Sequence, residues 1–127
     1  MKNEIKIHTI EDGYKIVNYF DIAKYILHCD DGPAYISLHD NNMPFNNIYF
    51  IHGKKHKEDG PALRVWDDKN YLKEERWYIN DKLHNFNGPA VIRYFDAEIQ
   101  NEYFIYNIKY SEFEFKKYIF QKKLDLL

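Results

Sequence analysis

The chain has 127 residues, of which 45% are hydrophobic and 18% aromatic, so it is long enough for one folded domain and too apolar for a disordered chain. Its formal net charge of −2 lacks the basic excess of a general polyanion binder, and its one cysteine, Cys29, excludes an internal disulfide. There is no apolar run of the ~20 residues that a membrane-spanning helix needs, nor an N-terminal apolar segment typical of a signal peptide. We therefore expect a soluble, cytoplasmic protein.

The N-terminal segment predicts a hairpin. Residues Glu4–Ile10 alternate polar and apolar side chains, Asp12 and Gly13 are a strong turn signal, and Tyr14–Phe20 completes the pair. We interpret residues 1–27 as a degenerate first unit of the repeat described next. Within it, residues 21–27 fit either a helical turn or a bulged strand.

The central part of the chain repeats the tripeptide Gly-Pro-Ala at residues 32–34, 60–62 and 88–90, a spacing of 28 residues. A histidine precedes each glycine by four residues, and an aspartate follows each alanine by six; they are His28, His56 and His84, and Asp40, Asp68 and Asp96. A fixed period of this size indicates a repeat architecture. Glycine can leave a turn at unusual backbone angles, proline is tolerated at a strand's first residue, and alanine admits a close neighbour.

Each tripeptide is followed by two runs rich in aromatic and β-branched residues, which favour strands. The first runs are Tyr35–Leu38, Leu63–Trp66 and Val91–Tyr94; the second are Ile48–Ile51, Trp77–Ile79 and Tyr103–Ile105. A polar turn separates the two runs in each copy. We therefore predict one β-hairpin per unit across residues 28–110.

The C-terminal segment breaks this pattern, because Tyr110 replaces the histidine and no tripeptide follows. Ser111 and Glu114 have the spacing of a capping box at a helix N-terminus. We predict a helix over residues 111–127 that covers the last unit. The face that we expect to pack carries Phe113, Phe120, Leu124 and Leu127.

The stretch from Tyr49 to Ala62 resembles the repeat W-Y-x-N-G-K-x-H-R-x-D-G-P-A, and the stretch from Trp77 to Ala90 is similar to it. This repeat is grouped with the MORN-like (membrane occupation and recognition nexus) repeats of bacteria, bacteriophages and giant viruses. The resemblance covers about residues 19–110. It implies repeated hairpins and an accessory protein of a phage, virus or bacterium, and it implies no catalytic residues.

The repeated histidines and aspartates could be metal ligands or general acids. In a meander of strands about 4.8 Å apart, however, equivalent residues of successive units lie roughly 10 Å apart, too far for one zinc ion or one carboxylate pair. We expect each histidine to bond the backbone of its own loop and pack on the proline, and each aspartate to open a turn. Because nucleotide-binding and hydrolase motifs are absent from the sequence, we predict no enzyme, metal or cofactor.

Two sets of large side chains are expected to form columns on the sheet: Tyr49, Trp77 and Tyr103, and Leu38, Trp66 and Tyr94. Both columns could be core. A single-layer meander with one helix leaves a face partly open, however, and an exposed aromatic patch usually marks a partner site. Stacking of nucleobases on Trp66, with Arg64 and Arg93 nearby, is a further alternative.

The longest predicted turn, from Asp40 to Asn47, carries two large apolar residues, Met43 and Phe45. One interpretation is that Phe45 folds back onto Tyr49 or Tyr71. The other is that Met43 and Phe45 anchor a partner.

The sequence therefore predicts a mainly β fold, an antiparallel meander of about four hairpin units with a C-terminal capping helix. Its predicted function is a non-enzymatic protein-binding module; in a phage or virus it would inhibit a host defence protein in the host cytoplasm. The alternatives are a MORN-like scaffold at a membrane surface, served by the lysines of the helix, and a sheet that binds a small ligand or nucleic acid, the latter through a nucleoprotein target. The candidate partner-binding residues are Met43, Phe45, Arg64, Trp66, Arg93 and Tyr94.

Overall fold

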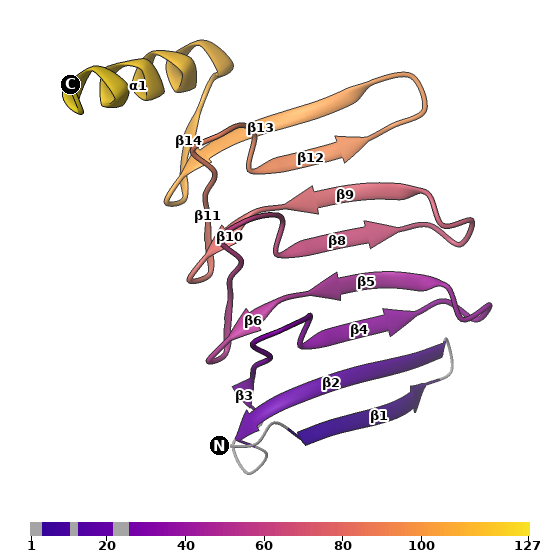
Figure 1. Cartoon of the computed structure of the whole chain (residues 1–127). Helices are drawn as coiled ribbons and strands as arrows, with labels where there is room; N and C mark the ends of the chain where they lie inside the picture. The colour runs from indigo at the N-terminus through magenta and orange to yellow at the C-terminus, as the bar shows by residue number, and fades with distance from the viewer. Residues whose placement is uncertain (1–3, 11–12, 22–25) are drawn as a thin grey trace.

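The computed structural model describes residues 4–10, 13–21 and 26–127 of the chain. Ten strands form one antiparallel sheet, and a single helix follows at the C-terminal end of the described chain (Figure 1). Successive hairpins lie side by side in chain order, in a single layer. The predicted fold class, a mainly β meander with a C-terminal helix, is confirmed.

The strands of the main sheet are β1 (Glu4–Ile10), β2 (Gly13–Asp21), β3 (Ile26–Leu27), β4 (Tyr35–Leu38), β5 (Pro44–Ile48), β8 (Leu63–Trp66), β9 (Leu72–Arg76), β12 (Val91–Tyr94), β13 (Ile99–Ile105) and β14 (Ile108–Tyr110). Their order is β1-β2-β4-β5-β8-β9-β12-β13-β14, with β3 beside β2. Two short pairs stand apart from it: β6 (Phe50–Ile51) with β7 (Lys54–Lys55), and β10 (Tyr78–Ile79) with β11 (Lys82–Leu83). Helix α1 spans Glu112–Asp125.

Each unit contains a long hairpin and a short one, and this corrects the prediction of one hairpin per unit. The second strands of the long hairpins end where the aromatic runs begin, β5 at Ile48 and β9 at Arg76, and the rest of each run starts the short hairpin instead. Both central residues of each short turn have positive φ, as a two-residue type I′ turn requires. These pairs are His52 and Gly53, Asn80 and Asp81, and Tyr106 and Asn107.

The alanines of the tripeptides are the most deeply buried residues of the repeat. Ala34, Ala62 and Ala90 are each 0% exposed. The carbonyl of Ala62 accepts the N–H of Tyr49 at 2.8 Å, and that of Ala90 accepts the N–H of Trp77 at 2.8 Å, so these two alanines join their strands to the preceding unit. The tripeptide glycines Gly32, Gly60 and Gly88 do not adopt left-handed backbone angles, which corrects the role predicted for them, whereas Gly53 does.

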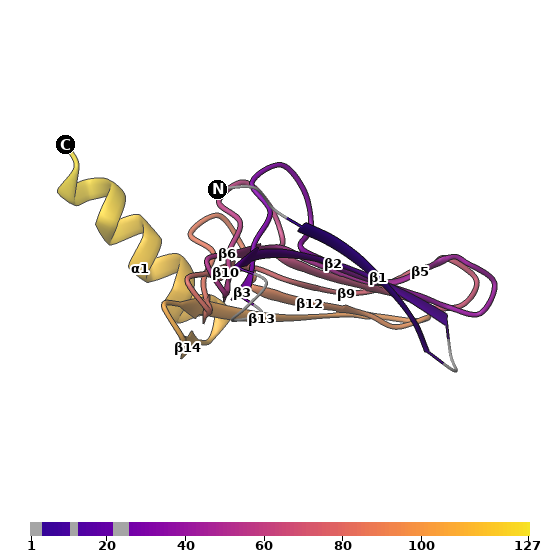
Figure 2. The same cartoon turned by 90° about the horizontal axis from the view of Figure 1, so that it is seen from below.

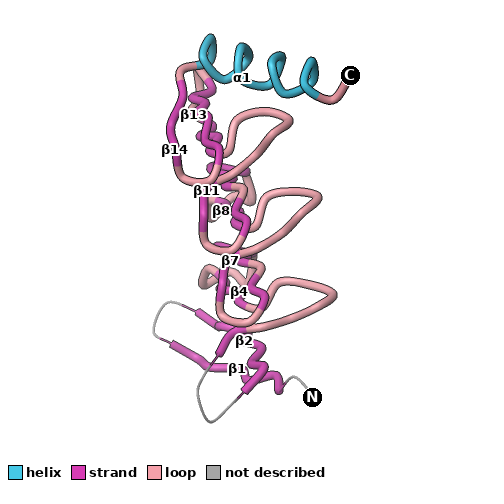
Figure 3. The backbone as a smooth tube through the Cα atoms, turned by 90° about the vertical axis from the view of Figure 1, so that its left-hand side faces the viewer, coloured by secondary structure: helices cyan, strands magenta, loops and turns pink. Residues whose placement is uncertain are grey.

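Each repeated histidine joins its Gly-Pro-Ala loop to the short turn that follows it. The Nδ1 atom of His28 accepts the backbone N–H of His52, that of His56 accepts Asn80 N–H, and that of His84 accepts Tyr106 N–H, at 2.9, 3.1 and 3.1 Å. The histidines are therefore structural, but their partner is the short turn that follows rather than their own loop. Figure 3 shows the loops that carry the histidines, which project from one side of the sheet, one after another.

Helix α1 begins as predicted, with the Ser111 side chain accepting Glu114 N–H at 3.1 Å. The face predicted to pack is wrong, because the buried helix residue is Phe115, whose ring lies 4.8 Å from that of Tyr103. The rings of Tyr110 and Tyr118 are 5.5 Å apart on the same side. From this contact the helix extends away from the sheet (Figure 2).

The predicted N-terminal hairpin is present as β1 and β2, paired from Glu4 with Tyr19 to Ile10 with Gly13. Strand β2 also pairs with β4, so this hairpin continues the meander. The predicted turn residue Asp12 and residues 22–25 of the undecided link lie outside the described residues, whereas residues 26–27 form strand β3. Among the described helices, none has the length and apolar character to cross a bilayer.

Candidate protein-binding surface at the long hairpin turns

Large apolar side chains are exposed at the turns of three consecutive long hairpins, at the end of the sheet opposite the short hairpins (Figure 1). Their exposed fractions range from 38% for Met43 to 65% for Tyr71. We call them the tip surface: Met43, Phe45, Tyr71, Phe95 and Ile99. Because apolar side chains on a folded protein are mostly withdrawn from water, such a row requires an explanation.

The first two turns share one backbone geometry. Asp67 N–H donates to Tyr71 O at 2.9 Å, and His39 N–H donates to Met43 O at 2.8 Å. Asn42 and Asn70 both have positive φ, which asparagine tolerates better than most residues. The turns therefore hold Met43 and Tyr71 at matching places.

The side chains that open these turns differ from the predicted ones. Asp67, not Asp68, accepts the N–H groups of Lys69 and Tyr71, at 2.9 and 3.0 Å. These donors, led by Tyr71 and helped by the Lys73 ammonium, hold the pKa of Asp67 below its ordinary value. In the first turn Asn41 accepts Met43 N–H instead. The prediction chose the aspartates because they recur every 28 residues. The residue that accepts the turn N–H groups is instead a neighbour of the repeated aspartate, Asn41 beside Asp40 and Asp67 beside Asp68.

Side chains also tie the three turns to one another. His39 Nε2–H donates to Trp66 O at 3.1 Å, and Asn41 Nδ2 donates to Asp68 O at 2.8 Å, which links the first turn to the second. Lys73 Nζ lies 3.6 Å from Asp67 and 3.8 Å from Asp96, which links the second to the third. These contacts connect the first turn with the second and the second with the third.

Two shallow depressions open between the second and third turns, with volumes of about 310 and 460 Å³. Both are lined by Lys73, Tyr94, Phe95 and Asp96. Burial, and then the Glu75 carboxylate that accepts the hydroxyl of Tyr94, raise the pKa of Tyr94 to about 12. Tyr94 therefore stays a neutral donor at physiological pH.

The two candidate arginines lie on opposite faces of the sheet. Arg64 is paired directly with Glu75, and Arg93 with Glu74, and consecutive strand residues point to opposite faces. Arg64 Nε bonds Glu75 at 2.9 Å. The predicted grouping of Arg64 and Arg93 around Trp66 is therefore wrong.

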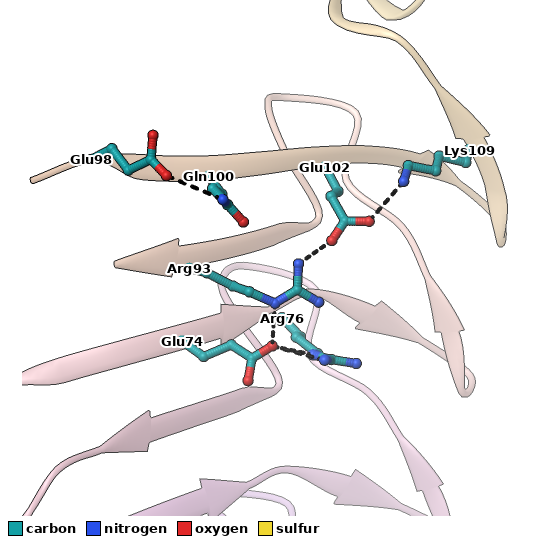
Figure 4. Close-up of polar contacts among 7 residues, drawn as sticks. All are labelled: Glu74, Arg76, Arg93, Glu98, Gln100, Glu102 and Lys109. Atoms are coloured by element: carbon teal, nitrogen blue, oxygen red, sulfur yellow. Dashed lines mark hydrogen bonds and ion pairs between the residues drawn. The ribbon is translucent and has the colours of Figure 1, made fainter. Parts of the chain in front are cut away.

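The face that carries Arg93 holds a network of ion pairs rather than a free basic patch (Figure 4). Arg93 contacts both Glu74 and Glu102, and Glu102 also binds Lys109 Nζ at 3.0 Å. Glu74 in turn binds Arg76 at 2.8 Å. Arg93 and then Lys109 lower the pKa of Glu102, so this carboxylate stays charged.

The candidate partner-binding residues therefore do not form one group in the structure. Met43 and Phe45 lie on the tip surface, although Phe45 belongs to strand β5 and not to the turn. Its ring contacts that of His39, with centroids 4.9 Å apart, rather than Tyr49 or Tyr71. Trp66 and Tyr94 are half-buried behind the surface.

Sequence reasoning missed Tyr71, Phe95 and Ile99. The signal that singled out Met43 and Phe45, large apolar residues beside a predicted turn, also applies to these three. They escaped notice because none of them belongs to a predicted strand run, and the stretches that hold them were assigned to polar turns. Among the described residues, no three His, Cys, Asp or Glu side chains gather closely enough to hold a metal ion. Comparison with family models, curated proteins and solved structures finds no match to this chain.

Proposed function

We propose that the chain is a non-enzymatic protein-binding module whose partner docks on the tip surface. The observation that carries the proposal is the row of five large apolar side chains, 38–65% exposed, across three cross-linked turns. Aromatic side chains are enriched at the centres of protein interfaces, and a fixed scaffold lowers the entropy cost of binding. Charged residues at the rim, Asp68, Lys69 and Asp96, would give the partner its orientation.

A protein partner suits this surface better than a nucleic acid. The net charge of −2 and the pairing of Arg64 and Arg93 with glutamates leave little basic surface for phosphates. The resemblance to repeats of phage and viral proteins adds a biological setting to the proposal. In that setting the chain is a small inhibitor that blocks a host protein by occupying its surface.

Affinity capture tests the proposal. The full chain is immobilised, and proteins from a lysate of the native host are captured on it, on a Tyr71→Ser, Phe95→Ser variant and on a Phe113→Ser control. Phe113 is exposed like the tip residues but lies on α1. We expect one protein to be retained by the wild type and the control, and at least tenfold less by the tip variant at equal folded concentration, a loss of about 1.4 kcal/mol. Equal retention by all three would refute the tip surface as the site.

A further inference from the structure

Helix α1 has two apolar faces, and only one of them is covered by the described chain. Phe115 is buried against Tyr103, on the face toward the sheet. On the other face Phe113, Phe120 and Leu124 are 78%, 64% and 44% exposed. We call these three residues the helix stripe. At about 100° per residue they fall within roughly 40° of one another around the helix axis.

The spacing of the helix stripe suits a second helix. Phe120 and Leu124 are four residues apart, like neighbouring residues in the seam between two paired helices, and Phe113 precedes Phe120 by seven, with Lys117 at the seam position between them. Helix α1 is 14 residues long, about 21 Å, and it extends away from the sheet (Figure 2). A helix of another molecule could therefore lie along it without meeting the sheet.

The charged residues beside the helix stripe indicate which partner helix, and which orientation, would suit it. Acidic residues, Glu112 and Glu114, stand in the first turn, and basic ones, Lys122 and Lys123, in the last. Glu112 and Lys123 are eleven residues apart and so lie about 20° apart around the axis, on one flank of the stripe. Glu112 pairs with Lys116 of its own helix at 2.9 Å, and this flank lines a hollow beside the loop from Phe86 to Pro89. In an antiparallel pair of identical helices, each Glu112 would meet the partner's Lys123, whereas a parallel pair would oppose like charges.

We propose that two copies of this chain associate through α1, antiparallel, with the helix stripes in contact. The apolar side chains leave water at the centre of the contact, and two reciprocal pairs of Glu112 with Lys123 fix its orientation. The two sheets then project from opposite ends of the helix pair, so both tip surfaces stay open. The contact is small compared with stable dimer interfaces, so the association is a concentration-dependent equilibrium.

Sedimentation equilibrium of the full chain, from about 10 μM to about 1 mM, tests the proposal. We expect a monomer–dimer equilibrium without larger species. Phe120→Glu should raise the dissociation constant at least tenfold. The matched control, Gln121→Glu, adds the same charge beside the stripe and should change it less than threefold. Because Phe120 is mostly exposed, the helix content and melting temperature of its variant should match the wild type.

A charge exchange tests the orientation. Glu112→Lys and Lys123→Glu each place like charges at both reciprocal contacts and should weaken dimerisation, while a 1:1 mixture of the two variants should dimerise at least fivefold more tightly than either alone. The comparison of mixed with separate variants cancels any effect on helix stability. A chain that is monomeric throughout, a Phe120→Glu variant that dimerises normally, or a mixture that gains nothing would each overturn the proposal. Partner capture by Phe120→Glu should be unchanged, so this test is independent of the proposed function.

Discussion

The Nδ1 atom of His84 accepts the backbone N–H of Tyr106 at 3.1 Å, and the two rings stack with centroids 3.9 Å apart. The bond spans 22 residues and connects a Gly-Pro-Ala loop with a short turn. The ring of Phe86 also meets that of His84 edge-on, with centroids 4.4 Å apart. One side chain therefore joins a Gly-Pro-Ala loop to the following short hairpin.

We expect His84→Ala to lower the free energy of unfolding by about 1–2 kcal/mol, because it removes this acceptor and the packing around it. Urea unfolding followed by tryptophan fluorescence measures the change. Asparagine offers an acceptor on a shorter side chain, so His84→Asn should lose less than His84→Ala. Equal losses in both variants would show that packing alone matters at this position.

Stability should also depend on pH through His84. Burial lowers its pKa below the ordinary 6.5, and Nδ1 accepts only while unprotonated. The folded state then binds fewer protons than the unfolded state, so the contribution of His84 is complete above pH 6.5 and is lost as the pH falls through the folded-state pKa. Urea midpoints between about pH 8 and pH 5 should fall more steeply for the wild type than for His84→Asn. Parallel curves would contradict this.

The buried alanines should reject larger side chains. Ala90 is 0% exposed, and its N–H and carbonyl are bonded to Glu102 and Trp77. We expect Ala90→Leu to cost about 1–3 kcal/mol through overpacking. Ala97 is exposed in the turn between β12 and β13, so Ala97→Leu should change stability by less than about 0.5 kcal/mol. Similar melting temperatures for the two variants would contradict the close packing described around Ala90.

Two adjacent aspartates give a further test of the turns. Asp67 accepts the N–H groups of Lys69 and Tyr71, whereas the Asp68 side chain is exposed. Asp67→Ala should lower the melting temperature and loosen the position of Tyr71. Asp68→Ala should be nearly neutral. Thermal unfolding of both variants separates these outcomes, and a larger loss at Asp68 would restore the repeated aspartates as turn-opening residues.

The sequence predicted the parts of this fold that depend on local pattern. The 28-residue period indicated a hairpin meander, and Ser111 with Glu114 marked the start of the helix. The bond from His84 to Tyr106 could not be predicted, because its two residues are 22 positions apart and no local spacing reveals it.

The packed face of α1 was mispredicted for a different physical reason. Phe113 and Phe115 both belong to apolar faces, and helical periodicity alone does not decide which face meets the sheet. The contact with Tyr103 decides it in favour of Phe115. The tip surface was found only in part, since exposure of Tyr71 and Phe95 depends on where the strands end.

Site-specific photo-cross-linking tests the central claim, partner binding at the tip surface, most directly. A photoreactive phenylalanine derivative is placed at position 71, 95 or 106, each an exposed aromatic residue, and the full chain is irradiated in a lysate of the native host. Tyr106 lies in a short turn, at the other end of the sheet from the tip surface (Figure 1). We expect the same protein to be cross-linked from positions 71 and 95 and not from position 106. An adduct formed from position 106, with none from positions 71 and 95, would contradict the account.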